Sequence, residues 1–573
     1  MSSLIANPEV SRRTAYLEPP GTWKIRGSFL RWISLERLIQ VITSPITVLF
    51  GVVIALLVPG ITHGEFFYHV DEQCHAMNGL FFRDLILDFP WRHPMQYVFD
   101  YYAKYPGINF PYWPPLFHLV EGLFFLVFGP TVWASRLSVL IFALMAVYFW
   151  YRIAERLGPR YLAFLSVILL MTIPVVLFHA RVTMLEIPAL ATCLGVAHFW
   201  LKFLDKERRR DLWALAGFIV ASFLISQKAI FLVPFLVISL VVERRFRLLR
   251  RLDVWLALVA SLVPVVSWNA LTFRHLDFTS NVAGSHLDFL ASLGNFTFYP
   301  TQLRYEFGPV LGLLVVFGLV VALWKRSPSY RFLLVWALAG YLTFSFIHDR
   351  EVRYTVQWLP PLIYLGLASL ETLLVRRSRA IIAASALTLV FLVSAFRTER
   401  PIVDGVKDVA NFVVSQQESD VVYYQGHLER DFIFWVRVFD PQKRRLVAKQ
   451  KQLSDMVGLS SPARTASGED AILEWFQTMG IRYAVVQDGD IIQRPNEVSD
   501  LAPMFNLLRS EKFELVKTFP IRTNQPDVLT RQIQVFRYRG ELHRAKVVVV
   551  PVGSIGEGIP IDLSRLVGHP WPK

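Results

Sequence analysis

The chain has 573 residues, of which 54% are apolar and only 18% charged, and its formal net charge is +14. Soluble domains are typically about 45–50% apolar and about 25% charged, so a string of ordinary soluble domains is excluded, and the aromatic content of 14% excludes disorder. The two cysteines, Cys74 and Cys193, exclude a disulfide scaffold and a cysteine-based zinc finger.

Eleven apolar runs predict membrane-spanning helices. A span needs about 17–25 predominantly apolar residues. The first 38 residues are polar, and the run that follows is long enough to remain in the membrane rather than act as a cleaved signal peptide. The predicted spans cover residues 40–60, 131–151, 161–178, 187–203, 212–226, 229–242, 253–270, 307–324, 331–347, 355–374 and 380–397.

Most of the positive charge lies between these spans. Residues 1–400 hold 37 basic and 24 acidic residues, whereas residues 401–573 hold 22 and 21. Cytoplasmic loops are enriched in Lys and Arg, and eleven spans with an inner N-terminus place every basic cluster of residues 1–400 inside. The charge therefore indicates orientation and not nucleic-acid binding.

The apolar run 116–129 decides the number of spans. It has only fourteen residues, a length that is typical of a re-entrant or interfacial segment. Counting it as a span would place Arg152 and the clusters that follow outside. We therefore expect three parts: a cytoplasmic segment at 1–38, a multi-pass domain at 39–400 with a long first outer loop at 62–130, and a periplasmic or extracellular domain at 401–573. The expected location is the cytoplasmic (inner) membrane.

Acids, bases and histidines collect at the predicted outer ends of the helices. Asp71 and Glu72 follow an aromatic run in the first outer loop, and Glu186 lies at the mouth of a span. A carboxylate in such a loop is either a solvated surface charge or a helix N-cap, but a firmly held carboxylate also suits a general base. Asp71, His75 and Glu186 are also ligand types for Mg, Mn or Zn, although their spacing is not specific for a metal.

The segment Val70–Ala76, Val-Asp-Glu-Gln-Cys-His-Ala, resembles the acidic motif of the GT-C glycosyltransferases. The likeness is closest to the protein mannosyltransferase and aminoarabinose transferase branch, glycosyltransferase families 39 and 83. Further elements of that branch are matched, in order, by Pro114-Pro115-Leu116, Phe128-Gly129, Arg136, Ala180-Arg181 with Glu186, His348–Tyr354 and Pro360-Pro361. The family more often has Asp at the position of Glu186.

This resemblance implies a GT-C fold of about eleven transmembrane helices and a hexosyl or pentosyl transferase of the cell envelope. Such an enzyme moves one sugar from a polyprenyl-phosphate donor to an acceptor outside the membrane, which here is an unknown protein, lipid or glycan. It implies Asp71 as the base of an inverting reaction, with Glu72 as second choice. Cations suited to the donor phosphate are Arg353, Arg350, Lys228, Arg181 and Arg304. Substrate contacts are expected at His75, Tyr112, Trp113 and Tyr354, although aromatic residues at a membrane interface look the same in sequence.

Residues 401–573 alternate helix-like segments with buried strands, which favours an α/β domain. The domain shows no nucleotide-binding, metalloprotease or Ser–His–Asp motif, so acceptor binding, partner docking and covering the active site stay open. A sequon, Asn295-Phe296-Thr297, lies in a predicted outer loop. Two other functions compete with the transferase. A transporter or lipid flippase would need internal repeats and midplane charges, and a non-catalytic receptor would leave the cluster of acids and bases without a role.

Overall fold

The computed structural model describes residues 43–66, 69–109, 112–273, 294–347, 350–449, 468–488, 503–525, 528, 530–551 and 558–569. The chain divides into a short unit, residues 1–48, and a large unit, residues 49–573, which holds all the features below. Of the short unit the structure describes residues 43–48, where helix α2 (Pro45–Leu57) begins.

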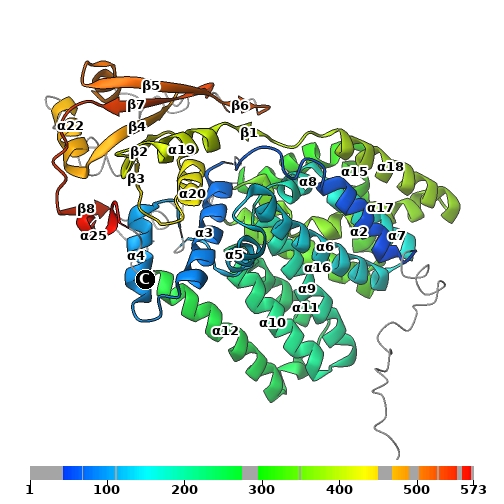
Figure 1. Cartoon of the computed structure of the whole chain (residues 1–573). Helices are drawn as coiled ribbons and strands as arrows, with labels where there is room; N and C mark the ends of the chain where they lie inside the picture. Colours follow the sequence, from blue (N-terminus) through cyan, green and yellow to red (C-terminus); the bar gives the residue numbers. More distant parts are fainter. Residues whose placement is uncertain are drawn as a thin grey trace, which may run out of the picture. The chain divides into compact units, whose positions relative to one another are not determined.

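Each of the eleven predicted spans coincides with a helix or a helix pair (Figure 1). After α2 these are α6 (Val132–Leu157), α7 (Arg160–Thr172), α8 (Pro174–Arg181), α9 (Glu186–Lys206), α10 (Arg209–Ile225), η1 (Gln227–Phe231), α11 (Leu232–Val242), α12 (Leu252–Phe273), α15 (Gly294–Lys325), α16 (Pro328–Ser345), α17 (Leu359–Leu373) and α18 (Arg377–Arg397). Within α15 the backbone is kinked at Gly308, where φ is 63°, and Pro309 follows. The predicted span 307–324 begins one residue before this kink.

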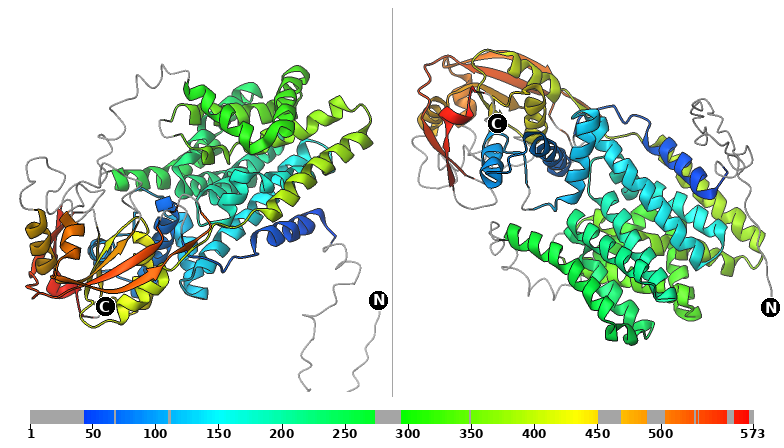
Figure 2. Two further views of the ribbon diagram at one scale, coloured as in Figure 1. Left: turned by 90° about the horizontal axis from the view of Figure 1, so that it is seen from above. Right: turned by 60° about the horizontal axis from the view of Figure 1, so that its bottom comes forward.

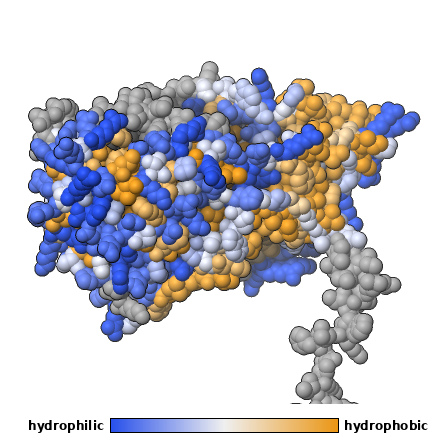
Figure 3. Space-filling view, turned by 45° about the horizontal axis from the view of Figure 1, so that its top comes forward, coloured by the Kyte–Doolittle hydropathy of each residue, from blue (hydrophilic) through white to orange (hydrophobic). Residues whose placement is uncertain are grey.

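Within the part of the chain that the structure describes, five helices are long and apolar enough to cross a membrane. The number is six when α7 and α8, bent by 67°, count as one broken span. Four further apolar segments are shorter, among them η1 with α11. Figure 3 shows apolar side chains gathered on one part of the surface, and exposed apolar residues such as Leu262, Val316 and Leu389 belong to α12, α15 and α18. The chain is therefore of integral-membrane type, and the count of eleven spans stays a prediction.

The first predicted outer loop folds into three helices: α3 (His69–Asp88), α4 (Pro94–Lys104) and α5 (Leu116–Phe128). The apolar run 116–129 is thus a 13-residue helix, and α5 packs against α3 and α6. Glycine allows α3 to approach α5 closely, because a Cβ at Gly79 would lie 2.4 Å from a carboxylate oxygen of Glu121.

The C-terminal region has the expected α/β architecture. It contains β1 (Val403–Asp404), α19 (Val406–Ser415), β2 (Val421–Gln425), α20 (Glu429–Phe439), β3 (Leu446–Lys449), α22 (Gly468–Met479), β4 (Ile481–Gln487), β5 (Phe513–Pro520), β6 (Arg522–Thr523), β7 (Gln532–Tyr538), β8 (Val547–Pro551), β9 (Gly558–Asp562) and α25 (Leu563–Leu566). The main sheet has the order β3-β2-β4-β7-β5, parallel from β3 to β4 and antiparallel from β4 to β5. All five residues of β2 are buried, as in a strand that is covered on both faces.

This domain is attached to the outer-loop helices by packing and by buried polar contacts. Helix α20 lies against α3 (Figure 1, Figure 2). At their contact the Nε of Arg437 lies 2.8 Å from Oδ2 of Asp84, and both side chains are buried. The carboxylate of Glu65, just before α3, accepts hydrogen bonds from the backbone N–H groups of Gly405 and Lys407 and so caps α19. The position of α3 is therefore set partly by the C-terminal domain.

Candidate active site

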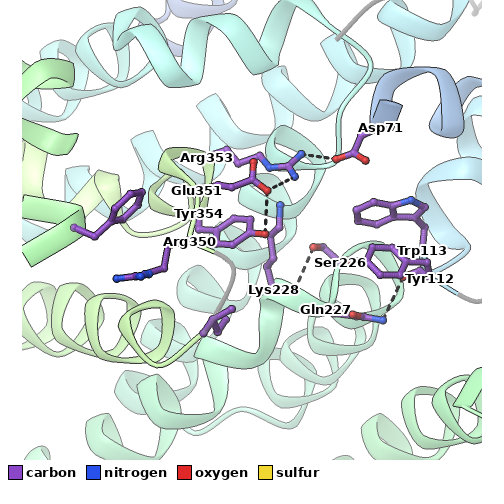
Figure 4. Close-up of a pocket in the computed structure, with 12 residues that line it drawn as sticks. Asp71, Tyr112, Trp113, Ser226, Gln227, Lys228, Arg350, Glu351, Arg353 and Tyr354 are labelled. Carbon is purple, nitrogen blue, oxygen red and sulfur yellow. Dashed lines mark hydrogen bonds and ion pairs between the residues drawn. The ribbon is translucent and has the colours of Figure 1, made fainter. Parts of the chain in front are cut away.

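A cavity of about 640 Å³ opens where α3, η1 and the segment after α16 meet (Figure 4). Five charged side chains from distant parts of the chain line it together with aromatic side chains. The lining residues are Asp71, Tyr112, Trp113, Ser226, Gln227, Lys228, Phe298, Ile347, Arg350, Glu351, Arg353 and Tyr354.

The two adjacent acids of the first loop face different ways. Both lie in the first turn of α3, and successive residues of a helix point about 100° apart. Asp71 lines the cavity, whereas Glu72 is only 1% exposed and its Oε1 accepts a hydrogen bond of 2.9 Å from the backbone N–H of Thr183. Of the two acids, only Asp71 lies within reach of a substrate in the cavity.

Arg353 connects three carboxylates around the cavity. It belongs to the short 3-10 helix η3 (Val352–Thr355). Its Nη1 lies 2.7 Å from Oδ2 of Asp71 and its Nη2 lies 2.6 Å from Oε1 of Glu351, while its Nε is 3.7 Å from Oε1 of Glu186. Burial lowers the pKa of the guanidinium, but the three carboxylates outweigh it and raise that pKa above its usual value.

Lys228 and Glu186 form a second ion pair beside Arg353. The Nζ of Lys228 lies 2.5 Å from Oε1 of Glu186 and 4.4 Å from the ring centre of Tyr354. Glu186 is 1% exposed and does not line the cavity. It is therefore a buried counter-charge behind two cations, and its Oε2 has no hydrogen-bond partner among the described residues.

His75 supports the cavity wall from behind. It is buried, its Nδ1 lies 3.0 Å from Nε2 of His118, and its ring packs at 5.0 Å from that of Trp113. Burial lowers the pKa of His75 to about 3, so the ring is neutral at physiological pH. Tyr112, Trp113 and Tyr354 line the cavity themselves, and their contact with substrate stays a prediction.

Of the five cations assigned to the donor phosphate, Lys228, Arg350 and Arg353 line the cavity and two do not. Arg181 donates hydrogen bonds to the carbonyl oxygens of Leu56, Ala395 and Thr398, at the ends of α2 and α18. A cation there satisfies carbonyl groups left free at helix C-termini. Arg304 is exposed on α15 and lies over the ring of Tyr305.

Three polar lining residues were not among the predicted site residues: Ser226, Gln227 and Glu351. Each is adjacent to a predicted cation or two residues from it, in the same short loop, which is the signal that could have identified them. Gln227 donates to the carbonyl oxygen of Tyr112 at 3.3 Å and so connects η1 to the aromatic wall.

The three residues suggested as metal ligands do not converge. Asp71 pairs with Arg353, Glu186 with Lys228, and His75 with His118. Among the described residues, no three or more His, Cys, Asp and Glu side chains are grouped to hold a metal ion. The side chains present do not fit a preformed cation site, and the divalent cation stays a prediction.

Comparison with known proteins identifies the fold. Residues 113–269 match the family model of dolichyl-phosphate-mannose-protein mannosyltransferase. No curated protein matches the chain.

Solved structures match over most of the chain. ArnT from Cupriavidus metallidurans in the apo state is 16% identical with a TM-score of 0.57, over 85% of this chain and 97% of ArnT. The same protein bound to undecaprenyl phosphate is 16% identical with a TM-score of 0.54, and the match covers 89% of this chain and 100% of that chain. An Archaeoglobus fulgidus oligosaccharyltransferase tethered to an acceptor peptide is 12% identical with a TM-score of 0.50. This match covers 92% of this chain and 77% of the oligosaccharyltransferase. The resemblance drawn from the motifs is confirmed, and the chain has the GT-C fold of membrane glycosyltransferases.

Proposed function

We propose that this GT-C chain transfers a single sugar from a polyprenyl-phosphate donor to an acceptor on the outer side of the membrane. The observation that carries the proposal is the cavity itself. It holds the carboxylate of Asp71 together with three cations, Lys228, Arg350 and Arg353, beside aromatic side chains. A base for the acceptor and charge for a phosphate leaving group are thus present in one site.

The cations match the donor phosphate. Arg offers a planar fork of donors and Lys a compact charge, and both recur where phosphates bind. The ArnT structure with undecaprenyl phosphate supports a lipid-linked donor in this fold.

A route for the lipid tail begins beside Lys228. An apolar groove of about 410 Å³ runs along α11, and its lining includes Ile230, Val233 and Leu240. Ile230 belongs to the same short helix, η1, as Lys228. A polyprenyl chain in this groove would present its phosphate at the cavity.

The chemistry then follows from the placement of Asp71. The carboxylate takes the proton of the acceptor group, whose oxygen forms a bond to the anomeric carbon from the face opposite the phosphate. The bond between that carbon and the phosphate oxygen breaks, and polyprenyl phosphate leaves with the electron pair. Lys228, Arg350 and Arg353 stabilise the charge that develops on the phosphate, and the configuration at the anomeric carbon is inverted.

The test uses the full chain in liposomes with labelled polyprenyl-phosphate sugars. Asp71→Asn removes the base and should lower transfer by about 10²–10⁴-fold, the usual contribution of a general base. Asp253→Asn is the matched control, because Asp253 also lies in the first turn of a helix and pairs with an arginine, Arg251, away from the cavity. Full activity of Asp71→Asn would refute the assignment, and equal losses in both variants would show that the effect is not specific to the base.

A further inference from the structure

A second cavity lies at the other end of α6 and α9 and has no role in the proposed transfer. Its volume is about 270 Å³. Glu186, behind the first cavity, begins α9, and Lys206, which lines the second, ends it. Twenty residues of helix at 1.5 Å each separate the two sites by about 30 Å.

Two regularly spaced stripes of side chains form its walls. Helix α6 contributes Tyr148, Arg152 and Arg156, and helix α9 contributes His198, Lys202 and Lys206. Both sets follow the spacing i, i+4, i+8, which places their members above one another on one face of a helix. Because α6 packs against α9, the two stripes face a shared space. Each stripe begins with a polar ring, Tyr148 or His198, and its two cations follow toward the predicted inner surface.

Two more cations line the cavity: Arg208, between α9 and α10, and Arg210, in the first turn of α10. Glu207, which follows Lys206, has a left-handed backbone with φ of 48° and is the C-cap of α9. Its carboxylate does not line the cavity and is paired instead with Arg247 and Arg251, which lie between α11 and α12.

The charge of this cavity is only partly balanced. Arg152 pairs with Glu155, Arg156 with Asp205, and Lys202 with Asp211. None of these acids lines the cavity.

The remaining cations Lys206, Arg208 and Arg210 have no ion-pair partner among the residues that the structure describes. Six cations thus surround a space with no acid in its lining, and a bound anion would relieve their mutual repulsion.

The deeper end of the cavity is lined by two hydrogen-bonding side chains, those of Tyr148 and His198. Eight residues of helix place His198 and Tyr148 about 12 Å deeper than Lys206 and Arg156. His198 is 7% exposed, and its Nδ1 has no hydrogen-bond partner among the described residues. Tyr148 is 40% exposed on a helix that the sequence predicts to span the membrane, so this end of the cavity is reachable from the lipid side.

We propose that this cavity binds the phosphate-bearing head group of an anionic phospholipid from the inner leaflet. Basic residues on the cytoplasmic side of a membrane protein are enriched simply as orientation signals. That orientation signal requires charges in a loop, but it requires neither two aligned stripes of side chains nor a cavity between them. The volume is below that of typical sites for a whole small molecule and suits a head group whose tails stay in the bilayer.

The experiment measures lipid binding to the full chain in detergent by native mass spectrometry. Phosphatidylglycerol, phosphatidylcholine and the soluble glycerol 3-phosphate are titrated in parallel. We expect phosphatidylglycerol to bind in preference to the other two. Equal binding of the two lipids would overturn the proposal, and equally tight binding of glycerol 3-phosphate would replace the lipid by a soluble phosphate.

Variants locate the binding. Arg208→Gln/Arg210→Gln should weaken phosphatidylglycerol binding about 25-fold, from about fivefold for each basic residue. The matched control Arg376→Gln/Arg379→Gln removes two exposed arginines from another predicted inner loop and should change binding less than about threefold. His198→Phe removes the ring nitrogens and should weaken binding about fivefold, the effect of one hydrogen bond. Equal losses in the two arginine pairs, or none in His198→Phe, would show a diffuse positive field and refute the cavity.

Discussion

Glu186→Gln removes the buried counter-charge behind the first cavity. In the native chain, Glu186 is within 2.5 Å of Lys228 and 3.7 Å of Arg353. The side chains of Glu186, Lys228 and Arg353 are 1%, 13% and 9% exposed, so solvent screens the pairs only weakly. The substitution therefore leaves two buried cations side by side with less neutralisation.

The expected magnitude follows from these contacts. Breaking a buried pair by removing one partner costs about 3–5 kcal/mol. Arg353 keeps Asp71 and Glu351, and the amide oxygen of the introduced glutamine can still accept a hydrogen bond from Lys228, so the lower end applies. We expect a loss of about 3 kcal/mol in the free energy of unfolding.

The measurement is a double-mutant cycle on thermal unfolding in one detergent, with Glu186→Gln, Lys228→Met and both together. The double variant should recover part of the stability lost by Glu186→Gln, with a coupling of about 1–3 kcal/mol. Transfer kinetics separate two roles: a positioning residue raises KM for the lipid donor with little effect on kcat, whereas a base lowers kcat. A wild-type melting temperature for Glu186→Gln, or strictly additive losses, would refute the ion-pair reasoning.

Three further outcomes are expected. Arg353→Lys cannot contact Asp71 and Glu351 at once, so kcat/KM in the transfer assay should fall about 100-fold; an unchanged rate would contradict the bridging role. Arg437→Met leaves the buried Asp84 without its partner on α20 and should lower the stability of this contact by about 3 kcal/mol. The loss would be observed as faster proteolytic release of the C-terminal domain, and wild-type resistance to the protease would argue against that contact. Burial raises the pKa of Glu65 from 4.5 to about 7, so its stabilising contribution is complete below pH 4.5 and is lost as the pH rises through 7. Glu65→Gln should therefore flatten the fall of the melting temperature with pH over this range. An unaltered pH dependence would assign that fall to other groups.

The membrane helices were predictable because hydropathy is a property of each local segment. All eleven apolar runs coincide with helices, and residues 116–129 form a helix too short for an ordinary span. The bend between α7 and α8 was not predicted, although Pro174 begins the second helix. The α/β nature of the C-terminal domain followed from its alternating pattern.

The cavity was only partly predictable, because sequence does not show which way a side chain points. Asp71 and Glu72 have the same chemistry and adjacent positions, yet only one faces the cavity. Arg181 looked like a phosphate ligand, but its guanidinium is used by carbonyl groups at helix ends more than 100 residues away in sequence. The pairing of Lys228 with Glu186 joins residues 42 positions apart and depends on the packing of η1 against α9. Such long-range contacts leave no local pattern in the chain.

The ion pair between α3 and α20 has a consequence for the order of events during synthesis. Asp84 and Arg437 are 353 residues apart, so at about 5–20 residues per second the ribosome adds Arg437 about 20–70 s after Asp84. During that interval the first outer loop is made but the partner of its carboxylate is not. The helix that carries Asp71 therefore completes its packing only after the membrane helices have been made, and a chain that stops before α20 lacks this contact to it.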